Sequence, residues 1–454
     1  MKHPAYPRTK PSGVEWLGDV PVHWETKKVT YGFSRIGSGT TPKSDSGDFY
    51  DGEVPWVTTS ELRETLITKT KESVTRSALS AYSALRLYPA GTLLFAMYGA
   101  TIGRLGTLGI PATLNQACCA FAAPTLFDIR FVFYWLWMRR PILISLSTGG
   151  GQPNLSQEDL RQIRIPTPPL PEQRVIAHFL DRETGRVDLL VAKKRELIER
   201  LKEKRTALIS RTVTHGLPPA AARAAGHPLN PPLKLSGVEW LGEVPKHWEV
   251  MKVKYIAKME SGHTPSRSEP SNWVDDECVI PWVSLNDTKH LKEHDYIGDT
   301  AVRISEEGMK NSSAHLLPPG VVVFTRDATI GLTAITTCPA AVSQHVIAWV
   351  PGPKITPKYL LLCFKVMQQY LESFPFGSTL KTIGMTDVRK IVTPVPPLSE
   401  QAAIASYLDH ETAKLDALVG KVEAAVERLQ EYRSALITAA VTGKIDVRKV
   451  LHGK

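Results

Sequence analysis

The sequence has few cysteines and no long apolar run. It holds five cysteines, an odd number, and none forms a Cys-x-x-Cys pair that would start a zinc site. Without a secretory leader, this usage argues against a disulfide framework and favours a reducing cytoplasm. The most apolar run, residues 131–138, is stopped by Arg139 and Arg140, well short of the ~20 residues that span a bilayer. We expect a buried helix there.

Motifs for phosphate, metal or nucleophile chemistry are also missing. No Gly-x-x-x-x-Gly-Lys-Ser/Thr loop occurs, which argues against nucleotide hydrolysis by this chain. The glycine run at residues 149–152 lacks that lysine and is more simply a loop, although a glycine-rich backbone could approach a phosphate; its counterpart supplies Lys381. The histidines, and acidic pairs such as Glu158 and Asp159, show no metal-ligand spacing and no catalytic triad, so we expect surface residues and helix caps.

Composition is that of a folded, basic protein. Apolar residues make up 43% and charged residues 22%, which excludes general disorder. A length of 454 residues suits two or more domains. The formal charge of +10 raises the prior for an anionic partner such as nucleic acid.

Much of the sequence is written twice. Residues 12–25 return as residues 236–249 with only two changes, Asp19 to Glu243 and Val22 to Lys246. Further elements recur in the same order: Gly39-Thr-Thr-Pro42 and Gly262-His-Thr-Pro265, residues 100–103 and 328–331, Gln116 and Gln344, and Pro168-Pro-Leu-Pro-Glu-Gln173 and Pro396-Pro-Leu-Ser-Glu-Gln401. Between them the halves diverge, as at Tyr98 against Asp327, so we expect one frame with two different surfaces.

The boundary between the halves is rich in alanine and proline, over residues 217–232, and reads as a linker. Asn230-Pro231-Pro232 in this segment has the composition of an amino-methyltransferase loop, but Leu233 follows it and no glycine-rich cofactor loop precedes it, which favours the linker. Short β-rich runs such as residues 91–95 and 321–324, between glycine, proline and serine clusters, predict a mixed α/β domain in each half.

Each half ends in a long helical pattern. Apolar residues at 3/4 spacing predict two coiled-coil helices of roughly 44 residues and about 65 Å each. Charged residues interrupt the seam at Lys194, Lys204, Arg211 and Glu411. The predicted helix–helix seam consists of Ile176, Leu180, Leu190, Leu197, Leu201, Leu208, Ile404, Leu408, Leu415, Leu418, Val422, Leu429 and Leu436.

A repeated chain favours a pseudo-two-fold arrangement, in which these helices run antiparallel and carry the domains at opposite ends. Two different domains so spaced could read one DNA duplex at separated half-sites, about one to two turns of ~34 Å apart. An asymmetric, bipartite target is therefore predicted.

The doubled Trp-Leu-Gly-x-Val-Pro-x-His-Trp segment, the Gly-x-Thr-Pro and Ala-Thr-Ile-Gly elements and the Pro-Pro-Leu-x-Glu-Gln helix start resemble the specificity subunit of type I restriction-modification systems. The resemblance covers nearly the whole chain. It implies a non-catalytic subunit with two tandem target-recognition domains, at about 26–165 and 250–392, and two spacer helices. It also implies assembly with two methyltransferase subunits and with motor nuclease subunits, in which the partners, and not this chain, use S-adenosylmethionine, ATP and magnesium.

The expected organisation is a first recognition domain over residues 1–165, a spacer helix over 166–216, a linker over 217–235, a second recognition domain over 236–395 and a second spacer helix over 396–445. Two other readings remain. A self-contained DNA methyltransferase would need a cofactor loop and catalytic motif for which the repeats leave no room. A scaffold that binds no DNA explains the heptads but not two divergent domains on a basic chain.

Candidate DNA contacts are the polar and basic residues that flank the repeated glycines, because glycine lets the backbone approach the duplex. They are Thr41, Lys43, Tyr98, Arg104 and Gln116 in the first domain and His263, Arg267, Arg326, Gln344 and Lys381 in the second. For each of them a structural or solvated role is an open alternative.

Three points refine these candidates. Gln116 and Gln344 could read adenine through paired hydrogen bonds, or they could be buried amides that tie strands together. Arg326 and Asp327 have no match in the first half and are favoured for individual specificity. Residues 193–211 carry eight Lys/Arg against three Glu, so this helix could lie near phosphate or an acidic partner, although a solvated face is the usual explanation. The repeated tryptophans are expected in the core, at helix termini or at a methyltransferase contact.

Overall fold

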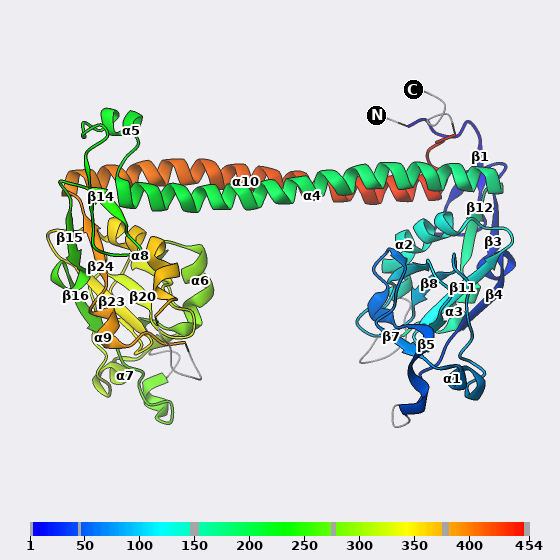
Figure 1. The fold of residues 1–454 in the computed structure, drawn as a ribbon, viewed down its shortest axis with the longest axis horizontal. Helices are drawn as coiled ribbons and strands as arrows, with labels where there is room; N and C mark the ends of the chain where they lie inside the picture. Colours follow the sequence, from blue (N-terminus) through cyan, green and yellow to red (C-terminus); the bar gives the residue numbers. More distant parts are fainter. Residues whose placement is uncertain (1–2, 44–46, 146–153, 274–277, 375–380, 449–454) are drawn as a thin grey trace. The chain divides into compact units, whose positions relative to one another are not determined.

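The computed structural model describes residues 3–43, 47–145, 154–273, 278–374 and 381–448 (Figure 1). The chain divides into two compact units. Unit 1 comprises Met1–Arg195 and Glu423–Lys454, and unit 2 comprises Glu196–Val422. Both divisions fall inside the two long helices, α4 (Leu170–His215) and α10 (Leu398–Val441).

Unit 1 is built around a five-stranded sheet with the order β4-β11-β8-β9-β6 and a three-stranded sheet with the order β10-β5-β7. The strands of unit 1 are β1 (Thr9–Pro11), β2 (Asp19–Pro21), β3 (Glu25–Lys28), β4 (Phe33–Ser38), β5 (Tyr50–Val57), β6 (Leu66–Ile67), β7 (Glu72–Val74), β8 (Leu93–Ala96), β9 (Leu105–Leu108), β10 (Thr113–Leu114), β11 (Cys118–Pro124) and β12 (Arg164–Thr167). Its shorter helices are η1 (Val29–Gly32), η2 (Gly47–Phe49), η3 (Thr59–Glu61), α1 (Arg76–Ala81), α2 (Ile129–Ser145) and α3 (Gln157–Gln162).

The five-stranded sheet of unit 1 is buried on both faces because its side chains alternate between two cores. Leu93 and Phe95 of β8 join the cluster that contains α2, whereas Leu94 and Ala96 join a second cluster with Leu114. The expected buried helix over residues 131–138 is confirmed as part of α2. Among the described residues, no helix is both long and apolar enough to cross a membrane.

Unit 2 repeats this plan, with a five-stranded sheet β16-β23-β20-β21-β18 and a three-stranded sheet β19-β17-β22. Its strands are β13 (Leu233–Leu235), β14 (Glu243–Pro245), β15 (Glu249–Lys252), β16 (Ala257–Ser261), β17 (Ile280–Val283), β18 (Tyr296–Ile297), β19 (Arg303–Ile304), β20 (Val322–Thr325), β21 (Thr333–Thr336), β22 (Ala341–Val342), β23 (Val346–Pro351) and β24 (Val392–Val395). Its shorter helices are α5 (Pro219–Ala224), η4 (Val253–Tyr255), η5 (Pro270–Trp273), η7 (Leu285–Asp287), α6 (Thr288–Glu293), α7 (Glu306–Lys310), α8 (Pro357–Leu371) and α9 (Met385–Val388).

The segment expected to be a linker, residues 217–235, contains regular structure. Helix α5 begins at a proline, which suits the first helical position, and continues through alanines. Strand β13 pairs antiparallel with β14. Local composition alone therefore does not describe this segment.

The two long helices run antiparallel within each unit. In unit 1, Asp188 of α4 pairs with Arg433 of α10 at 2.9 Å, and beyond it Val191 clusters with Val426. In unit 2, Arg205 pairs with Asp416 at 3.0 Å. Residue numbers fall along α10 as they rise along α4, which confirms the predicted antiparallel helix pair and, with the two sheet domains, the predicted mixed α/β fold.

The register of the predicted seam is wrong in the middle of the helices. Leu190, Leu197 and Leu418 are 48%, 44% and 47% exposed. Val191 and Ile198 are buried in place of the first two. Val191 and Ile198 directly follow Leu190 and Leu197 in sequence, so they lie about 100° around the helix from them. The contact between two helices is too narrow to bury both of these apolar rows.

The remaining seam residues lie closer to the interior. Ile176, Leu180 and Leu436 belong to the core of unit 1, and Ile404 and Leu408 belong to the core of unit 2. Leu415 is buried, and those that are half-buried are Leu201, Leu208, Val422 and Leu429.

Each core also takes in the end of a helix that begins in the other half of the sequence. Ile209 and Val213, near the end of α4, belong to the core of unit 2. Ile437 and Val441, at the end of α10, belong to the core of unit 1. The sheet domain of each unit is therefore packed against both helices.

The repeated tryptophan segments fix these helix junctions. At the start of α4, the buried carboxylate of Glu172 accepts hydrogen bonds from Trp24 Nε1 at 3.1 Å and Tyr6 Oη at 2.6 Å, and lies 2.7 Å from His23 Nε2. At the start of α10, Glu400 accepts from Trp248 Nε1 at 3.0 Å. The proposed packing of Trp24 and Trp248 at helix termini is thereby confirmed.

Candidate DNA interface

In both units the Gly-x-Thr-Pro loop, residues 39–42 and 262–265, lies against a neighbouring backbone segment. The Gly39 and Thr40 N–H groups donate to the carbonyls of Asn115 and Leu114 at 3.3 and 3.1 Å. A Cβ on Gly39 would lie 1.6 Å from the Leu114 carbonyl oxygen, so only glycine permits this approach.

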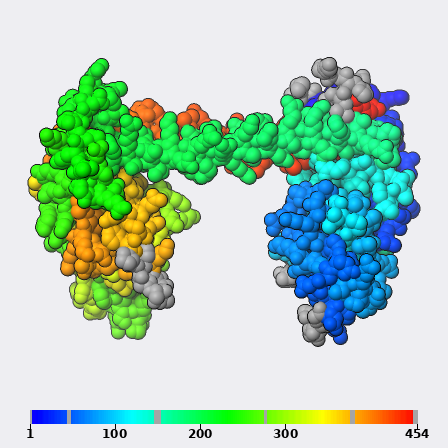
Figure 2. Space-filling model, viewed as in Figure 1, coloured from blue at the N-terminus to red at the C-terminus, as the bar shows by residue number. Residues whose placement is uncertain are grey.

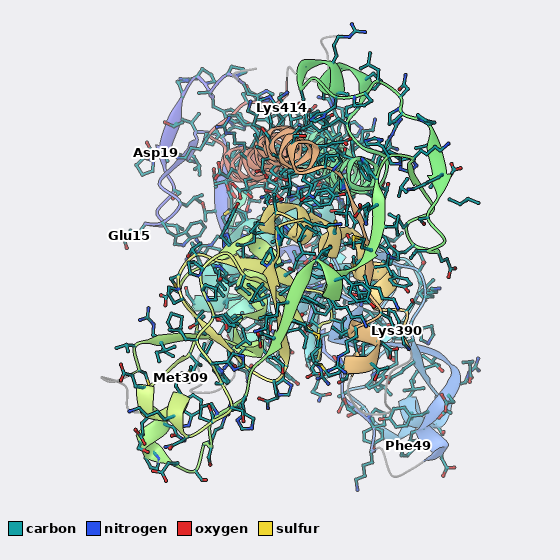
Figure 3. The ribbon with its side chains drawn as sticks, turned by 90° about the vertical axis from the view of Figure 1, so that its left-hand side faces the viewer. Glu15, Asp19, Phe49, Met309, Lys390 and Lys414 are labelled. Carbon is teal, nitrogen blue, oxygen red and sulfur yellow. The ribbon has the colours of Figure 1, made fainter. Side chains whose placement is uncertain are left out.

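The same approach occurs in unit 2, where a Cβ on Gly262 would lie 1.5 Å from the Val342 carbonyl oxygen. A tryptophan side chain also hydrogen-bonds to the backbone of each loop. Trp56 Nε1 donates to the Thr40 carbonyl and Trp282 Nε1 to the His263 carbonyl, both at 3.3 Å. These indoles belong to small apolar lobes, in which Phe49 and Met309 are labelled in Figure 3.

The next residue of the loop contacts the turn that precedes β11 or β23, residues 115–118 and 343–346, which we call the glutamine turn. Thr41 Oγ1 donates to Gln116 Oε1, and Thr264 Oγ1 donates to Gln344 Oε1. Both glutamines are exposed, so the alternative that they are buried amides is wrong. They do tie two segments together, and each amide also faces solvent.

Backbone hydrogen bonds define which residues correspond beside the glutamine turn. Met97 N–H donates to the Ala117 carbonyl at 2.8 Å, and Arg326 N–H donates to the His345 carbonyl at 3.0 Å. The next residues, Tyr98 and Asp327, both form an isolated antiparallel bridge. Met97, Tyr98 and Ala117 in unit 1 therefore stand where Arg326, Asp327 and His345 stand in unit 2.

The two units differ in chemistry at these matched positions. In unit 2, His345 Nδ1 lies 2.6 Å from Asp327 Oδ2, and Arg326 Nε lies 3.7 Å from Asp327 Oδ1. In unit 1 the position of Asp327 holds a phenol, Tyr98. Burial raises the pKa of Tyr98, and a hydrogen bond with Gln116 opposes that change, so the phenol is neutral at pH 7.

A sequence model of the family described as "Type I restriction modification DNA specificity domain" matches residues 21–200 and 245–428, which together exceed half of the chain. The chain belongs to this family. Each of the two matches includes one Gly-x-Thr-Pro loop and one glutamine turn, so the specificity domain occurs twice.

Curated relatives carry corresponding names. The MjaVIII specificity subunit of Methanocaldococcus jannaschii is 23% identical over 95% of both chains. The MjaIX specificity subunit of the same organism is 31% identical, but over 37% of this chain, and the match spans 39% of its own length. The EcoKI specificity subunit of Escherichia coli strain K12 is 22% identical over 66% of this chain and 62% of its own.

Two solved structures have the same fold as this chain. The HsdS subunit from Thermoanaerobacter tengcongensis has a TM-score of 0.55 and 18% identity, and covers 94% of this chain and 98% of its own. A chain described under "Structural basis underlying complex assembly and conformational transition of the type I R-M system" has a TM-score of 0.67 and 17% identity, and covers 94% and 99%.

The other candidate contacts of the specificity domains lie around the loop and the turn. Lys43 and Arg267 are exposed beside the Gly-x-Thr-Pro loops, and Arg267 lines a hollow of about 550 Å³ with Trp273 and Trp282. His263 is exposed within its loop. The exposed Lys381 directly precedes Thr382, the bridge partner of Asp327, and its carbonyl accepts from Ala328 N–H at 2.9 Å.

Arg104 lies beside the strand next to the glutamine turn, because its carbonyl accepts from Ala96 N–H at 2.8 Å and Ala96 pairs with Cys118. It is exposed just before β9, and no side-chain hydrogen bond or ion pair among the described residues links it to the loop. The glycine run at 149–152 lies outside the described residues. Where the chain is described, no group of three or more His, Cys, Asp or Glu side chains is placed to hold a metal ion.

Sequence reasoning missed one residue of this surface, His345. It directly follows Gln344, and its counterpart after Gln116 is Ala117. A signal was present, because a histidine replaces an alanine beside an element that both halves share. The contact with Asp327, 18 positions away, required the fold.

Proposed function

We propose that this chain reads an asymmetric DNA target made of two short blocks, one for each specificity domain, and directs partner subunits to it. The observation that carries the proposal is the exchange of Met97, Tyr98 and Ala117 for Arg326, Asp327 and His345 on matched backbone positions. Identical readers would require a palindrome, whereas different side chains on one frame require two different blocks.

The contacts divide by chemistry. Exposed Gln116 and Gln344 have the amide geometry that reads adenine N6 and N7 in the major groove, and are proposed to specify bases. The basic side chains around them are proposed to bind phosphates, which position the protein without specifying sequence. These are Lys43, Arg104, His263, Arg267 and Lys381, with Thr41 and Tyr98 at the edge of the same surface.

Partner subunits are proposed from the family and from the surface of α4. The relatives are named specificity subunits of type I restriction enzymes, and the expected partners are two methyltransferase subunits and the restriction subunits. Side chains in the middle of α4 lie at the surface (Figure 2), and they include Leu189, Leu190 and Leu197, each more than 40% exposed. An apolar row of this kind suits a protein partner.

Catalysis is assigned to those partners. S-adenosylmethionine, ATP and magnesium would be bound by them, and this chain would supply the choice of target. The same exposed apolar residues would suit a scaffold that binds no DNA. A scaffold function, however, leaves the matched loops and their exposed glutamines without a role. A self-contained methyltransferase would transfer methyl groups without a partner.

The test exchanges the differing side chains. The wild-type chain and a triple variant, Arg326→Met with Asp327→Tyr and His345→Ala, are each co-expressed with the methyltransferase. Methylated adenines are then mapped across the host DNA. We expect the triple variant to change or lose one block of the target and to keep the other. An unchanged motif would show that these positions do not select bases.

A further inference from the structure

The glutamine turn of unit 2 contains a continuous line of side-chain hydrogen bonds that ends on a carboxylate, Asp327, where unit 1 has the phenol of Tyr98. Gln344 Nε2 lies 3.2 Å from His345 Nε2, and His345 Nδ1 lies 2.6 Å from Asp327 Oδ2. With the bond from Thr264 to Gln344 Oε1, these four residues form what we call the Gln344 network. Asp327 is 14% exposed in its side chain, so its position is set by the surrounding protein.

The direction of every hydrogen bond in the Gln344 network follows from its acidic end. An ionised carboxylate only accepts, so His345 must carry its proton on Nδ1 and donate to Asp327. The structure places the NH₂ nitrogen of Gln344 3.2 Å from Nε2, and an amide nitrogen can only donate, so Nε2 is the acceptor. The Gln344 amide must therefore point its NH₂ at His345 and its oxygen at Thr264.

An amide fixed in this way has one N–H and one oxygen lone pair left for a ligand. That pair matches the N7 acceptor and N6 donor of adenine, and a flipped amide would present the two groups in the wrong order. In unit 1 the residue after Gln116 is Ala117, which has no polar side-chain atom, and the Gln116 amide hydrogen-bonds with Tyr98 instead.

We infer that His345, held by Asp327, is a positioning residue that fixes the amide of Gln344 in the orientation that reads adenine. The inference rests on the proposed function, because it concerns how one proposed base contact is oriented. It predicts that an adenine in the second block of the target depends on a residue that need not touch the base.

The experiment uses the chain assembled with its methyltransferase and measures kcat/KM for methyl transfer to synthetic duplexes. Each position of the two blocks is varied through the four base pairs, and each adenine of the second block is also replaced by 7-deazaadenine, which lacks the N7 acceptor. The variants are His345→Phe, which removes the acceptor, and His345→Gln, which restores an amide oxygen near the place of Nε2.

For wild type we expect 7-deazaadenine at one position to lower kcat/KM by about tenfold, within the range of one paired amide contact. In His345→Phe that penalty and the preference for adenine there should fall to about twofold or less, with every other position unchanged. His345→Gln should recover most of both. His290→Phe is the matched control, because His290 is a half-buried histidine of the same domain, as His345 is, and its Nε2 lies 2.8 Å from the Tyr296 carbonyl; it should match wild type.

Two results would overturn the inference: a His345→Phe variant that stays active with an unaltered 7-deazaadenine penalty, or one that stays active but loses base preference equally at all positions. Either leaves the proposed function intact, since wild type still selects a two-block target. A wild-type complex that methylates without sequence preference would instead refute the proposed function itself. Failure of His345→Phe to fold would appear as loss of activity on every duplex, and His345→Gln would then carry the comparison through its 7-deazaadenine penalty.

Discussion

Replacing the buried glutamate at each helix start should destabilise the two units unequally. Glu172→Ala removes the acceptor of two buried donors, Tyr6 Oη and Trp24 Nε1. Glu400→Ala removes the acceptor of one buried donor, Trp248 Nε1. The chain thus contains its own matched control for the extra tyrosine.

The magnitudes follow from the number of donors left without a partner. A buried donor without an acceptor costs about 1–3 kcal/mol, so Glu172→Ala should cost about 2–6 kcal/mol and Glu400→Ala about 1–3 kcal/mol. The neighbouring histidines, His23 and His247, are about a third exposed and can turn to water, so they add little. In the Glu172→Ala background, Tyr6→Phe should be neutral or stabilising, whereas in wild type it should destabilise.

The assay must report each unit separately, because a chain of two units need not unfold in one step. Native-state hydrogen exchange does so, read by mass spectrometry on peptides from α2 for unit 1 and from α8 for unit 2. Exchange in α2 should accelerate more in Glu172→Ala than exchange in α8 does in Glu400→Ala. Equal effects, or a larger effect at Glu400, would refute the assignment of the extra energy to Tyr6.

Three further outcomes are expected. Leu190→Asp, at an exposed position of α4, should change the free energy of unfolding by less than about 0.5 kcal/mol but reduce co-purification of the methyltransferase. Val191 is 8% exposed in the seam, so Val191→Asp should lower the free energy of unfolding, measured with denaturant, by about 3 kcal/mol. Gly262→Ala should abolish selection of one block in methylation assays, because the added Cβ would collide with the Val342 carbonyl. At Gly420 a Cβ would meet no atom within 4 Å, so Gly420→Ala should raise the free energy of unfolding by about 0.5–1 kcal/mol. Burial raises the pKa of the Tyr134 phenol to about 12, whereas the pKa in the unfolded chain is about 10. The stabilisation from the protonated phenol is therefore complete below pH 10 and is lost between about pH 10 and 12, by up to about 1.4 kcal/mol per pH unit. A denaturant midpoint that falls as steeply with pH in Tyr134→Phe as in wild type would contradict this.

The repeat made the main features of the fold predictable. One frame written twice implies two similar domains, and the apolar spacing after Gln173 and Gln401 implies two long helices. Both glutamines also show why the motif recurs. Gln173 Nε2 donates to the Pro168 carbonyl and Gln401 Nε2 to the Pro396 carbonyl, both at 2.9 Å, which holds the turn before each helix.

The seam register could not be predicted, because Leu190 and Val191 are both apolar and adjacent. Spacing alone does not decide between neighbouring rows, and only the partner helix selects one. The sharing of each core between helix ends was equally hidden, since contacts such as that of Val213 with the second core join residues far apart in sequence.

The candidate site was predictable only in part. Glycines and glutamines shared by both halves marked a loop and a turn that the fold brings together, and the mismatch at Arg326 and Asp327 marked where the halves differ. The role of His345 depends on a hydrogen bond to Asp327 that spacing does not reveal. Arg104 was chosen for its glycine neighbour, and no side-chain hydrogen bond or ion pair among the described residues links it to the loop and turn.

The central claim is that the chain selects an asymmetric target of two blocks. Its most direct test is co-expression with the neighbouring methyltransferase and mapping of methylated adenines across the host DNA by single-molecule sequencing. We expect one motif of two different short blocks separated by a fixed run of unspecified bases. No new methylation with an active methyltransferase, or a palindromic motif, would contradict it.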